Sequence, residues 1–344
     1  MEVRAQSPMQ RAGPLAGIPA LLAELKVSED VAFAGSPIRP GDLFAENYLP
    51  FRDVLSLLAA CARASGRSDL GLLLGLRADH RSLGLVGAAM EHAETFGEAI
   101  LDYVGVQVGL SQGAVGYVIP SGDCLAIGFG IHDRYQPGSN QVYGLAMAVA
   151  ANTLRRLTGG QVEPLEVHFC HRAPDSAASY AKLLRATVLF SQAQSCVVIP
   201  AAAWKVRNPG ANRAARQAVL AELQRALRLD EIAVTMRLRH HLRPLITAGV
   251  PSRTAAAKQL GLHPRTLARR LATEGTTFER ERDAVRCAMA CELLAMTDLP
   301  IGEIAIALCY STHAAFDEAF GRWNGTSPAR WRKSQQAEPA MREP

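Results

Sequence analysis

Apolar residues recur at helical spacing through much of the first half of the chain. From Phe51 to Ala64 they fall three and four positions apart, which is the period of an amphipathic helix. Thr95, with Glu98 three residues later, has the pattern of a capped helix start and predicts a helix that runs toward Val108. Further helices are expected over 18–27, 69–77, 145–157 and 176–184.

Between these helices lie segments with the composition and boundaries of β-strands. Gly113–Ile119 and Cys124–Ile131 flank the sequence PSGD, which is a turn by composition. Leu165–Cys170 and Cys196–Ile199 predict two further strands. Helices and strands therefore mix in this part of the chain, and the sequence predicts an α+β domain over residues 1–205.

After the break at Asn208-Pro209-Gly210 the pattern becomes helical throughout. Residues 213–243 predict one long helix that ends before Pro244. Its apolar stripe comprises Val219, Leu220, Leu223 and Leu227. We assign residues 206–236 as a helical linker whose stripe either forms a homodimer or interdomain contact or packs on its own domain. An all-α domain then covers 237–333, and a disordered tail is expected over 334–344.

The segment 252–271, SRTAAAKQLGLHPRTLARRL, has the pattern of two short helices around a tight turn. Ser252 suits a helix N-cap, Gly261 supplies the positive φ that a helix end needs, and Pro264 fits the first turn of the second helix. The second helix then presents an outer face to solvent. That face carries His263, Arg265, Thr266, Ala268 and Arg269. Such a face can enter the major groove of DNA, where arginine contacts guanine bidentately.

The stretch from Pro251 to Arg332 resembles the DNA-binding domain of the AraC/XylS family, which has two helix-turn-helix units. The matching residues are Ala256, Leu260, Gly261, Leu267, Arg270-Leu271, Phe278, Arg286, Ala290, Leu293-Leu294, the 301–305 segment IGEIA, Tyr310-Ser311, Phe316, Phe320, Arg322-Trp323, Gly325 and the 326–332 segment TSPARWR. The resemblance implies two recognition helices joined by a rigid helix over 278–296. It extends the expected DNA contacts to Ser311, Thr312, His313, Asp317, Glu318 and Arg332.

Two features depart from the family pattern. Cys309 stands where the family has the turn glycine of the second unit, and a side chain in that left-handed conformation costs about 1 kcal/mol. Asp317 and Glu318 bring negative charge to the second recognition helix, which Ser311 is expected to cap, and a basic residue is common at position 318. We therefore expect the first unit to dominate affinity for DNA.

The N-terminal region resembles the arabinose-binding-type effector domain that precedes this DNA-binding domain in many regulators. The matching segments are 68–72, 74–75, 83–87, 95–99, 164–169, 173–174 and Tyr180. The resemblance implies a transcription activator that binds double-stranded operator DNA, a small-molecule effector and RNA polymerase. It does not identify the effector or its contact residues, because relatives sense amino acids, fatty acids and other metabolites.

Composition and charge agree with a soluble DNA-binding protein. Residues 237–333 hold 15 Lys and Arg against 9 Asp and Glu, whereas the rest of the chain holds 22 against 23. A basic segment on a neutral body suits contact with phosphate, although a solvated surface without a partner has the same pattern. No uncharged apolar run of about 18 residues occurs, and no secretory signal is recognised, so we expect a cytoplasmic location and no membrane contact.

An alternative function comes from Phe169-Cys170-His171-Arg172, which is similar to the Pro-Cys-His-Arg motif of alkyl-DNA repair proteins. In that motif the cysteine accepts an alkyl group after activation by His and Arg. Here Phe replaces the proline, and the four residues fit a strand end equally well. His168, Cys170 and His171 lack a fourth metal ligand nearby. No metal, cofactor or catalytic residue is therefore predicted, and His240 and His241 are expected to be solvated.

Overall fold

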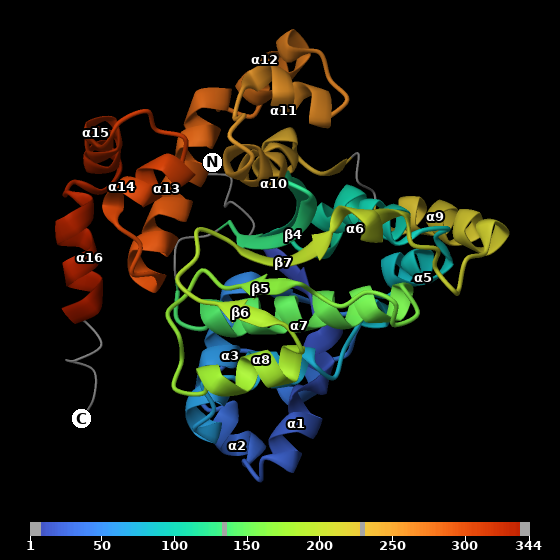
Figure 1. Ribbon diagram of the computed structural model, residues 1–344. Helices are drawn as coiled ribbons and strands as arrows, with labels where there is room; N and C mark the ends of the chain where they lie inside the picture. The colour runs from blue at the N-terminus through green and yellow to red at the C-terminus, as the bar shows by residue number, and fades with distance from the viewer. Residues whose placement is uncertain (1–7, 133–135, 228–230, 338–344) are drawn as a thin grey trace.

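The computed structural model describes residues 8–132, 136–227 and 231–337. An α+β N-terminal body is followed by a helical C-terminal region, which lies along the upper left of Figure 1 in orange and red. The predicted fold class is confirmed. Across the described helices, none combines the length and the apolar composition needed to cross a lipid bilayer.

One five-stranded sheet forms the centre of the N-terminal body, with the strand order β3-β4-β7-β5-β6. Neighbouring strands pair antiparallel, except that β5 and β6 run parallel. The strands are β3 Ala114–Ser121, β4 Cys124–Ile131, β5 Glu166–His168, β6 Thr187–Leu189 and β7 Ser195–Pro200, and a separate pair is formed by β1 Met9–Arg11 and β2 Tyr48–Pro50. The short strand β6 and the pair β1–β2 were not predicted from the sequence.

Helices pack against this sheet, and the long helix α7 contacts its strands β4 and β7. The helices of this body are α1 Ile18–Glu24, α2 Glu29–Ala32, α3 Phe51–Ser65, α4 Leu70–Gly75, α5 Leu85–His92, α6 Phe96–Leu110, α7 Ser139–Leu157, α8 Ala177–Leu184 and α9 Arg213–Leu227. Helix α4 packs closely on α7 because Gly71 has no side chain, and a Cβ there would lie 1.9 Å from the Gln141 carbonyl oxygen. Helix α7 begins six residues before the predicted start, and α5 was not predicted.

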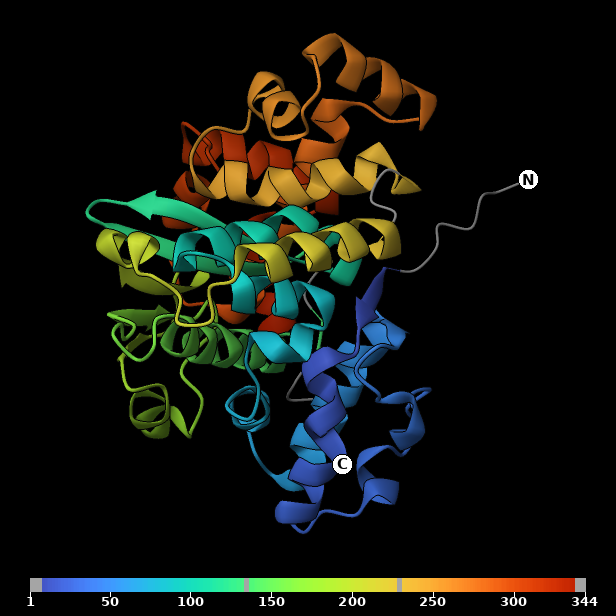
Figure 2. The same cartoon turned by 90° about the vertical axis from the view of Figure 1, so that its right-hand side faces the viewer.

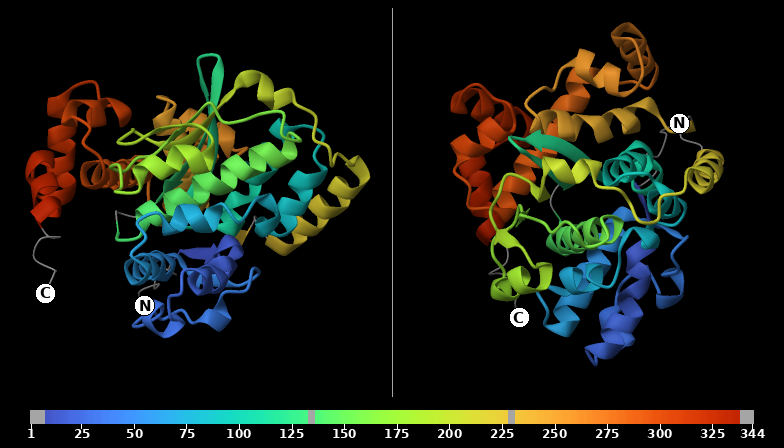
Figure 3. Two further views of the ribbon diagram at one scale, coloured as in Figure 1. Left: turned by 60° about the horizontal axis from the view of Figure 1, so that its bottom comes forward. Right: turned by 45° about the vertical axis from the view of Figure 1, so that its right-hand side comes forward.

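The C-terminal region contains seven described helices. They are α10 Val234–Thr247, α11 Arg253–Gln259, α12 Pro264–Thr273, α13 Phe278–Met296, α14 Ile301–Ala307, α15 His313–Asn324 and α16 Pro328–Ala337. Residues 334–337 are helical, so the predicted disordered tail is wrong there, and residues 338–344 lie outside the described residues. Figure 3 shows this region on the side of the molecule opposite α9.

The predicted single helix over 213–243 is wrong, because two helices, α9 and α10, occupy this stretch. The N-terminus of α10 is capped by a carboxylate that is distant in sequence. Glu274 accepts hydrogen bonds from the backbone N–H groups of Val234 and Thr235, both at 2.8 Å. Although burial opposes ionisation, these bonds lower the pKa of Glu274. Pro244 lies inside α10 rather than beyond it, and the helix continues to Thr247. Proline has no backbone N–H, so one helical hydrogen bond is missing, but this loss falls in the last turn of the helix.

The apolar stripe of α9 packs on its own domain, as Figure 2 shows for α9 lying along α5 and α6. Leu223 is 2% exposed and joins Val86 and Leu110 in a small cluster, with Leu220 and Leu227 at its edge. Arg216 adds charged contacts to α6, donating to Asp102 at 2.9 Å. Residues 213–227 therefore belong to the N-terminal body, in contrast to their assignment as a linker.

Candidate nucleic-acid interface and its contacts with the N-terminal domain

The first helix-turn-helix unit comprises α11 and α12, and its local geometry follows the sequence prediction. The Ser252 hydroxyl accepts a hydrogen bond from the Ala255 N–H at 3.1 Å, and Gly261 has a φ of +65°. His263 precedes Pro264 and caps α12, with Nδ1 accepting from the Arg265 N–H at 3.3 Å. This capping role of His263 was not predicted.

The outer face of α12 presents the predicted DNA contacts. His263, Arg265 and Arg269 are exposed, whereas Thr266 and Ala268 are half-buried. Within the described chain neither Arg265 nor Arg269 forms an ion pair, so both guanidinium groups are available to a partner. Their contact with bases stays a prediction.

The second unit comprises α14 and α15. Thr312, and not Ser311, caps α15: its hydroxyl accepts from the Ala315 N–H at 3.1 Å. Thr312 directly precedes the first helical residue and has extended backbone angles, whereas Ser311 lies one residue too early to be the cap. Both residues are exposed and lie beside the start of the recognition helix.

The charges on α15 are paired along the helix. Glu318 accepts from Arg322 at 3.1 Å, and His313 lies 3.4 Å from Asp317. All four side chains are exposed, so these contacts are weak. The Arg322 guanidinium nevertheless offsets part of the negative charge that the sequence places on this face. The DNA contacts expected of His313, Asp317 and Glu318 stay predictions.

Cys309 adopts the left-handed conformation, with a φ of +61°, as expected of the residue that replaces the turn glycine. Its thiol donates to the Ile246 carbonyl at 3.1 Å, and its own carbonyl accepts from Arg286 at 3.3 Å. The Arg286 guanidinium also lies 4.8 Å from the centre of the Tyr310 ring. The second turn is thereby tied to α10 and α13.

Arg332, predicted to contact DNA, is engaged within the protein. It donates to the carbonyl oxygens of Leu294 at 3.3 Å and Leu299 at 2.7 Å. Burial, followed by the positive charge of Arg172, lowers its pKa. Arg332 therefore holds α16 against the end of α13. These contacts indicate a structural role for Arg332 rather than a contact with DNA.

A buried polar network joins the C-terminal region to the N-terminal domain. Glu292 on α13 accepts hydrogen bonds from Tyr143 of α7 and from Arg243 of α10. Arg243 also donates to the Ile131 carbonyl at 2.5 Å, at the end of β4. Although burial opposes the charged form, the nearby Glu292 raises the pKa of Arg243, so the guanidinium keeps its charge.

The position of Arg243 depends on the adjacent strand. A Cβ at Gly130 of β4 would lie 1.9 Å from the Arg243 Nε, so only glycine leaves room for this side chain. Arg243 and Glu292 are both 3% exposed, and Tyr143 is fully buried. Removing either charged partner, Arg243 or Glu292, leaves an uncompensated buried charge, which is costly.

Helix α10 makes a second contact with the N-terminal domain through histidine. His240 is 6% exposed and its Nε2 donates to the Ser111 carbonyl at 2.8 Å, so the expectation that it is solvated is wrong. Its ring lies 4.4 Å from the ring of His132. His241 is half-buried rather than solvated, and burial followed by the charge of His240 lowers its pKa to about 4.

The segment similar to the alkyl-acceptor motif also serves the domain contact. Arg172 donates to the carbonyl oxygens of Ala295 at 2.7 Å and Thr297 at 2.9 Å, at the end of α13, and pairs with Asp298 at 2.6 Å. Cys170 is fully buried, and burial, reinforced by the nearby Glu292, raises the pKa of its thiol to about 12. A thiol with a raised pKa is mostly protonated near neutral pH, and the protonated thiol is a weaker nucleophile than the thiolate.

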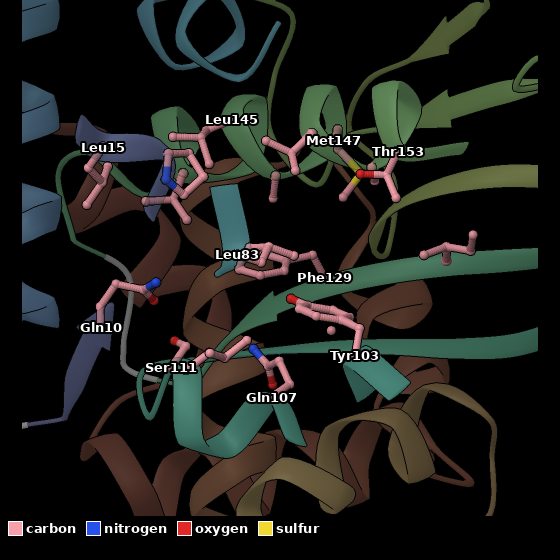
Figure 4. A pocket seen from close by; sticks show the side chains of 18 of the residues that line it. Gln10, Leu15, Leu83, Tyr103, Gln107, Ser111, Phe129, Leu145, Met147 and Thr153 are labelled. Atoms are coloured by element: carbon pink, nitrogen blue, oxygen red, sulfur yellow. The ribbon is translucent and has the colours of Figure 1, made fainter. Parts of the chain in front are cut away.

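A cavity of about 140 Å³ lies within the N-terminal domain. Its wall is formed by α3, α6, α7, the strands β3 and β4 and residues of the N-terminal segment. Tyr103, Phe129, Leu145 and Met147 are among the lining side chains shown in Figure 4. No group of three or more His, Cys, Asp or Glu side chains in the described chain is arranged to hold a metal ion.

Two family profiles match the chain. The profile of the arabinose-binding domain of AraC transcription regulators, N-terminal part, matches residues 27–208. A helix-turn-helix domain profile matches residues 256–334. The first covers the α+β body up to the break before α9, and the second covers both helix-turn-helix units and most of α16.

Curated relatives are similar over most of the chain. The ornithine utilization regulator of Pseudomonas aeruginosa is 28% identical over 329 residues, covering 91% of this chain and 93% of the relative. The HTH-type transcriptional regulator VirS of Mycobacterium tuberculosis is 27% identical over 303 residues, covering 86% and 88%. The solved structure of transcriptional regulator CdpR from Pseudomonas aeruginosa aligns with a TM-score of 0.47 and 25% identity, over 93% of this chain and 97% of that chain.

Proposed function

The chain belongs to the AraC-type family of DNA-binding transcription regulators with an arabinose-binding-type N-terminal domain, and from this premise we propose that a small molecule in that domain sets its affinity for operator DNA. The observation that carries the proposal is the buried Arg243–Glu292–Tyr143 network. An effector can alter DNA binding only if it distinguishes two arrangements of the protein. This network is where such a difference can be transmitted.

Helix α13 is the element through which the network acts on DNA binding. It follows α12 and precedes α14, so it joins the two helix-turn-helix units. Its last two turns are held by Tyr143 and Arg243 through Glu292, and its C-terminal end is held by Arg172. A ligand that shifts α7 or the end of β4 therefore changes the position of both recognition helices relative to the N-terminal domain.

The proposal assigns the chain no catalytic step, because Cys170 is buried and carries a raised pKa. It includes two partners besides the effector and DNA. One is RNA polymerase, which in vitro transcription from the operator-linked promoter can test. The other is a second copy of the chain, which sedimentation at several protein concentrations can test.

Titration of the full-length protein on the DNA upstream of its own gene tests the central proposal. The parent should bind one site about a thousandfold or more tightly than scrambled DNA. Tyr143→Phe removes one hydroxyl from the network and should change the operator Kd about fivefold or more. Tyr180→Phe, which removes a hydroxyl from a buried ring on α8, is the matched control.

Two results would contradict the proposal. Equal affinity of the parent for the upstream site and scrambled DNA would exclude a sequence-specific regulator of that site. An operator Kd for Tyr143→Phe equal to that of Tyr180→Phe would show that α13 is not coupled to the N-terminal domain through Glu292.

A further inference from the structure

We infer that the cavity bounded by α6, α7, β3 and β4 is the effector site and that it takes an uncharged, largely apolar molecule with one hydroxyl or carbonyl group. The inference rests on the proposed function and specifies the chemistry of its effector. It excludes sugars and free amino acids as the occupants of this cavity.

The size of the cavity limits its occupant. At about 140 Å³ it is close to the apolar cavity of about 150 Å³ that binds benzene in another protein. A ligand of about six to nine non-hydrogen atoms fits this space once side chains adjust. Most of the wall is aliphatic or aromatic, including Leu58, Ile127, Phe129 and Met147.

The wall carries no charge that could hold an ion. Asp, Glu, Lys, Arg and His are all absent from its described lining residues. Tyr103 is the ionisable group there, and burial raises its pKa to about 12, so it is neutral. An ionised carboxylate or ammonium group would therefore lose its hydration without gaining a counter-charge, which is costly. A zwitterionic amino acid does not fit this environment.

Most polar groups of the wall lie on one side of the cavity, and Thr153 lies on the other side, beside Met147. Figure 4 shows Gln10, Tyr103, Gln107 and Ser111 together, opposite Leu145 and Met147. Gln107 is 1% exposed: its Nε2 donates to the Ala114 carbonyl at 3.0 Å, and its Oε1 has no hydrogen-bond partner among the described residues. This side can pair one hydroxyl or carbonyl group. A sugar brings a hydroxyl on nearly every carbon, and most of these would face apolar side chains without a partner.

Two walls of the cavity touch the elements that carry the DNA-binding region. Ser111 lines the cavity, and its carbonyl accepts the hydrogen bond from His240 of α10. Phe129 also lines it, and its ring packs edge-on against Tyr143 with the centroids 6.3 Å apart. Tyr143 in turn donates to Glu292 of α13. A molecule in the cavity would therefore touch Ser111, which is bonded to α10, and Phe129, which packs on the Tyr143 that is bonded to α13.

Isothermal titration of the full-length protein with three probes tests the chemistry. Benzyl alcohol carries one hydroxyl on an apolar ring, whereas benzylamine has nearly the same shape and is protonated at pH 7. L-arabinose is the sugar probe. We expect benzyl alcohol to bind with a Kd below about 1 mM, and the other two to bind at least about tenfold more weakly.

Two variants connect the binding to this cavity. Ala146→Leu fills part of the space and should abolish benzyl alcohol binding, while Tyr103→Phe removes one polar group and should weaken it about fivefold. Tyr180→Phe is the control outside the cavity. The operator Kd is measured with and without 10 mM benzyl alcohol, and should shift severalfold in the parent and in Tyr180→Phe but not in Ala146→Leu.

The outcomes separate this inference from the proposed function. The inference is overturned if benzylamine or L-arabinose binds as tightly as benzyl alcohol, if benzyl alcohol does not bind, or if neither cavity variant changes its binding. It is also overturned if benzyl alcohol binds without shifting the operator Kd. In each case site-specific DNA binding by the parent would leave the proposed function standing, whereas loss of site preference would refute the proposed function.

Discussion

Arg265 and Arg269 lie one helical turn apart on the exposed face of α12, where each can reach a base edge. Replacing either with Ala should cost about 1 to 3 kcal/mol at the cognate site and relax the preference at one or two base pairs. Binding titrations on the cognate site and on single-base variants measure both effects. Arg225→Ala, an exposed position on α9, serves as the control. Equal losses on cognate and random DNA would identify phosphate contacts instead.

Cys309 pays a conformational cost in the turn of the second unit, because its φ is +61°. Cys309→Gly should relieve about 1 kcal/mol of strain, partly offset by loss of the thiol bond to Ile246 and by greater freedom of the unfolded chain. Cys309→Val keeps a side chain, adds β-branching and should destabilise the protein by more than 1 kcal/mol, on the order of 1 to 3. Urea unfolding of both variants measures the difference, and a valine variant as stable as the glycine variant would refute the strain.

Local residue patterns predicted the local contacts of the first unit but not the long-range ones. Ser252 and Gly261 act as the sequence indicated, since their partners lie within a few residues. The partners of Arg172 and Arg332 are backbone carbonyls 33 to 125 positions away, and no local pattern specifies them. The motif around Cys170 suggested chemistry for a segment whose arginine instead secures the end of α13.

Among the elements, α9 allows a direct test of its placement on the N-terminal domain. Leu223→Asp buries a carboxylate against Val86 and Leu110 and should destabilise the protein by about 3 kcal/mol or more. Thermal and urea unfolding measure the loss. The neighbouring Gln224→Asp is exposed and should change stability by less than about 0.5 kcal/mol. Similar unfolding of the two variants would mean that α9 lies elsewhere in solution.

Periodicity predicted most of the long elements and missed those that depend on tertiary contacts. The helix over Phe51–Ser65 and the strands around the PSGD turn lie close to their expected bounds, because each has a clear apolar period. The short strand β6 gains its place by pairing parallel with β5. The start of α10 depends on Glu274, 40 positions further on, so the helical pattern over 213–243 gave no sign of an interruption.

At the scale of the whole molecule, histidines at the domain contact make stability depend on pH. Burial lowers the pKa of His240 and His132, and that of His241 to about 4. The unfolded chain binds these protons at a pKa of about 6.5, whereas the folded protein does not. The contribution of these neutral histidines to stability is therefore fully present above about pH 6.5 and decreases as the pH falls from there toward 4. His241 alone accounts for a loss on the order of 3 kcal/mol.

Urea unfolding between pH 7.5 and 4.5 measures this loss, and His241→Gln isolates one contribution to it. The variant should lose less stability than the parent over this range, because glutamine takes up no proton. Gln224→Ala, an exposed position on α9 with no titratable group, should follow the parent curve. Parallel curves for the parent and His241→Gln would show that His241 keeps an ordinary pKa in the folded protein.

Arg172 and the Glu292 network hold α13 against the N-terminal domain. These contacts suggest that the N-terminal domain and the C-terminal region can be produced as two separate polypeptides. These bonds join side chains and backbone groups of separate elements, so they do not require a peptide connection between α9 and α10, although such a connection raises the local concentration of each half around the other. Two polypeptides, divided between these helices and produced together, should therefore reassemble into a working repressor or activator. The chain can therefore be tested as a split reporter, in which the joining of the two halves restores DNA binding.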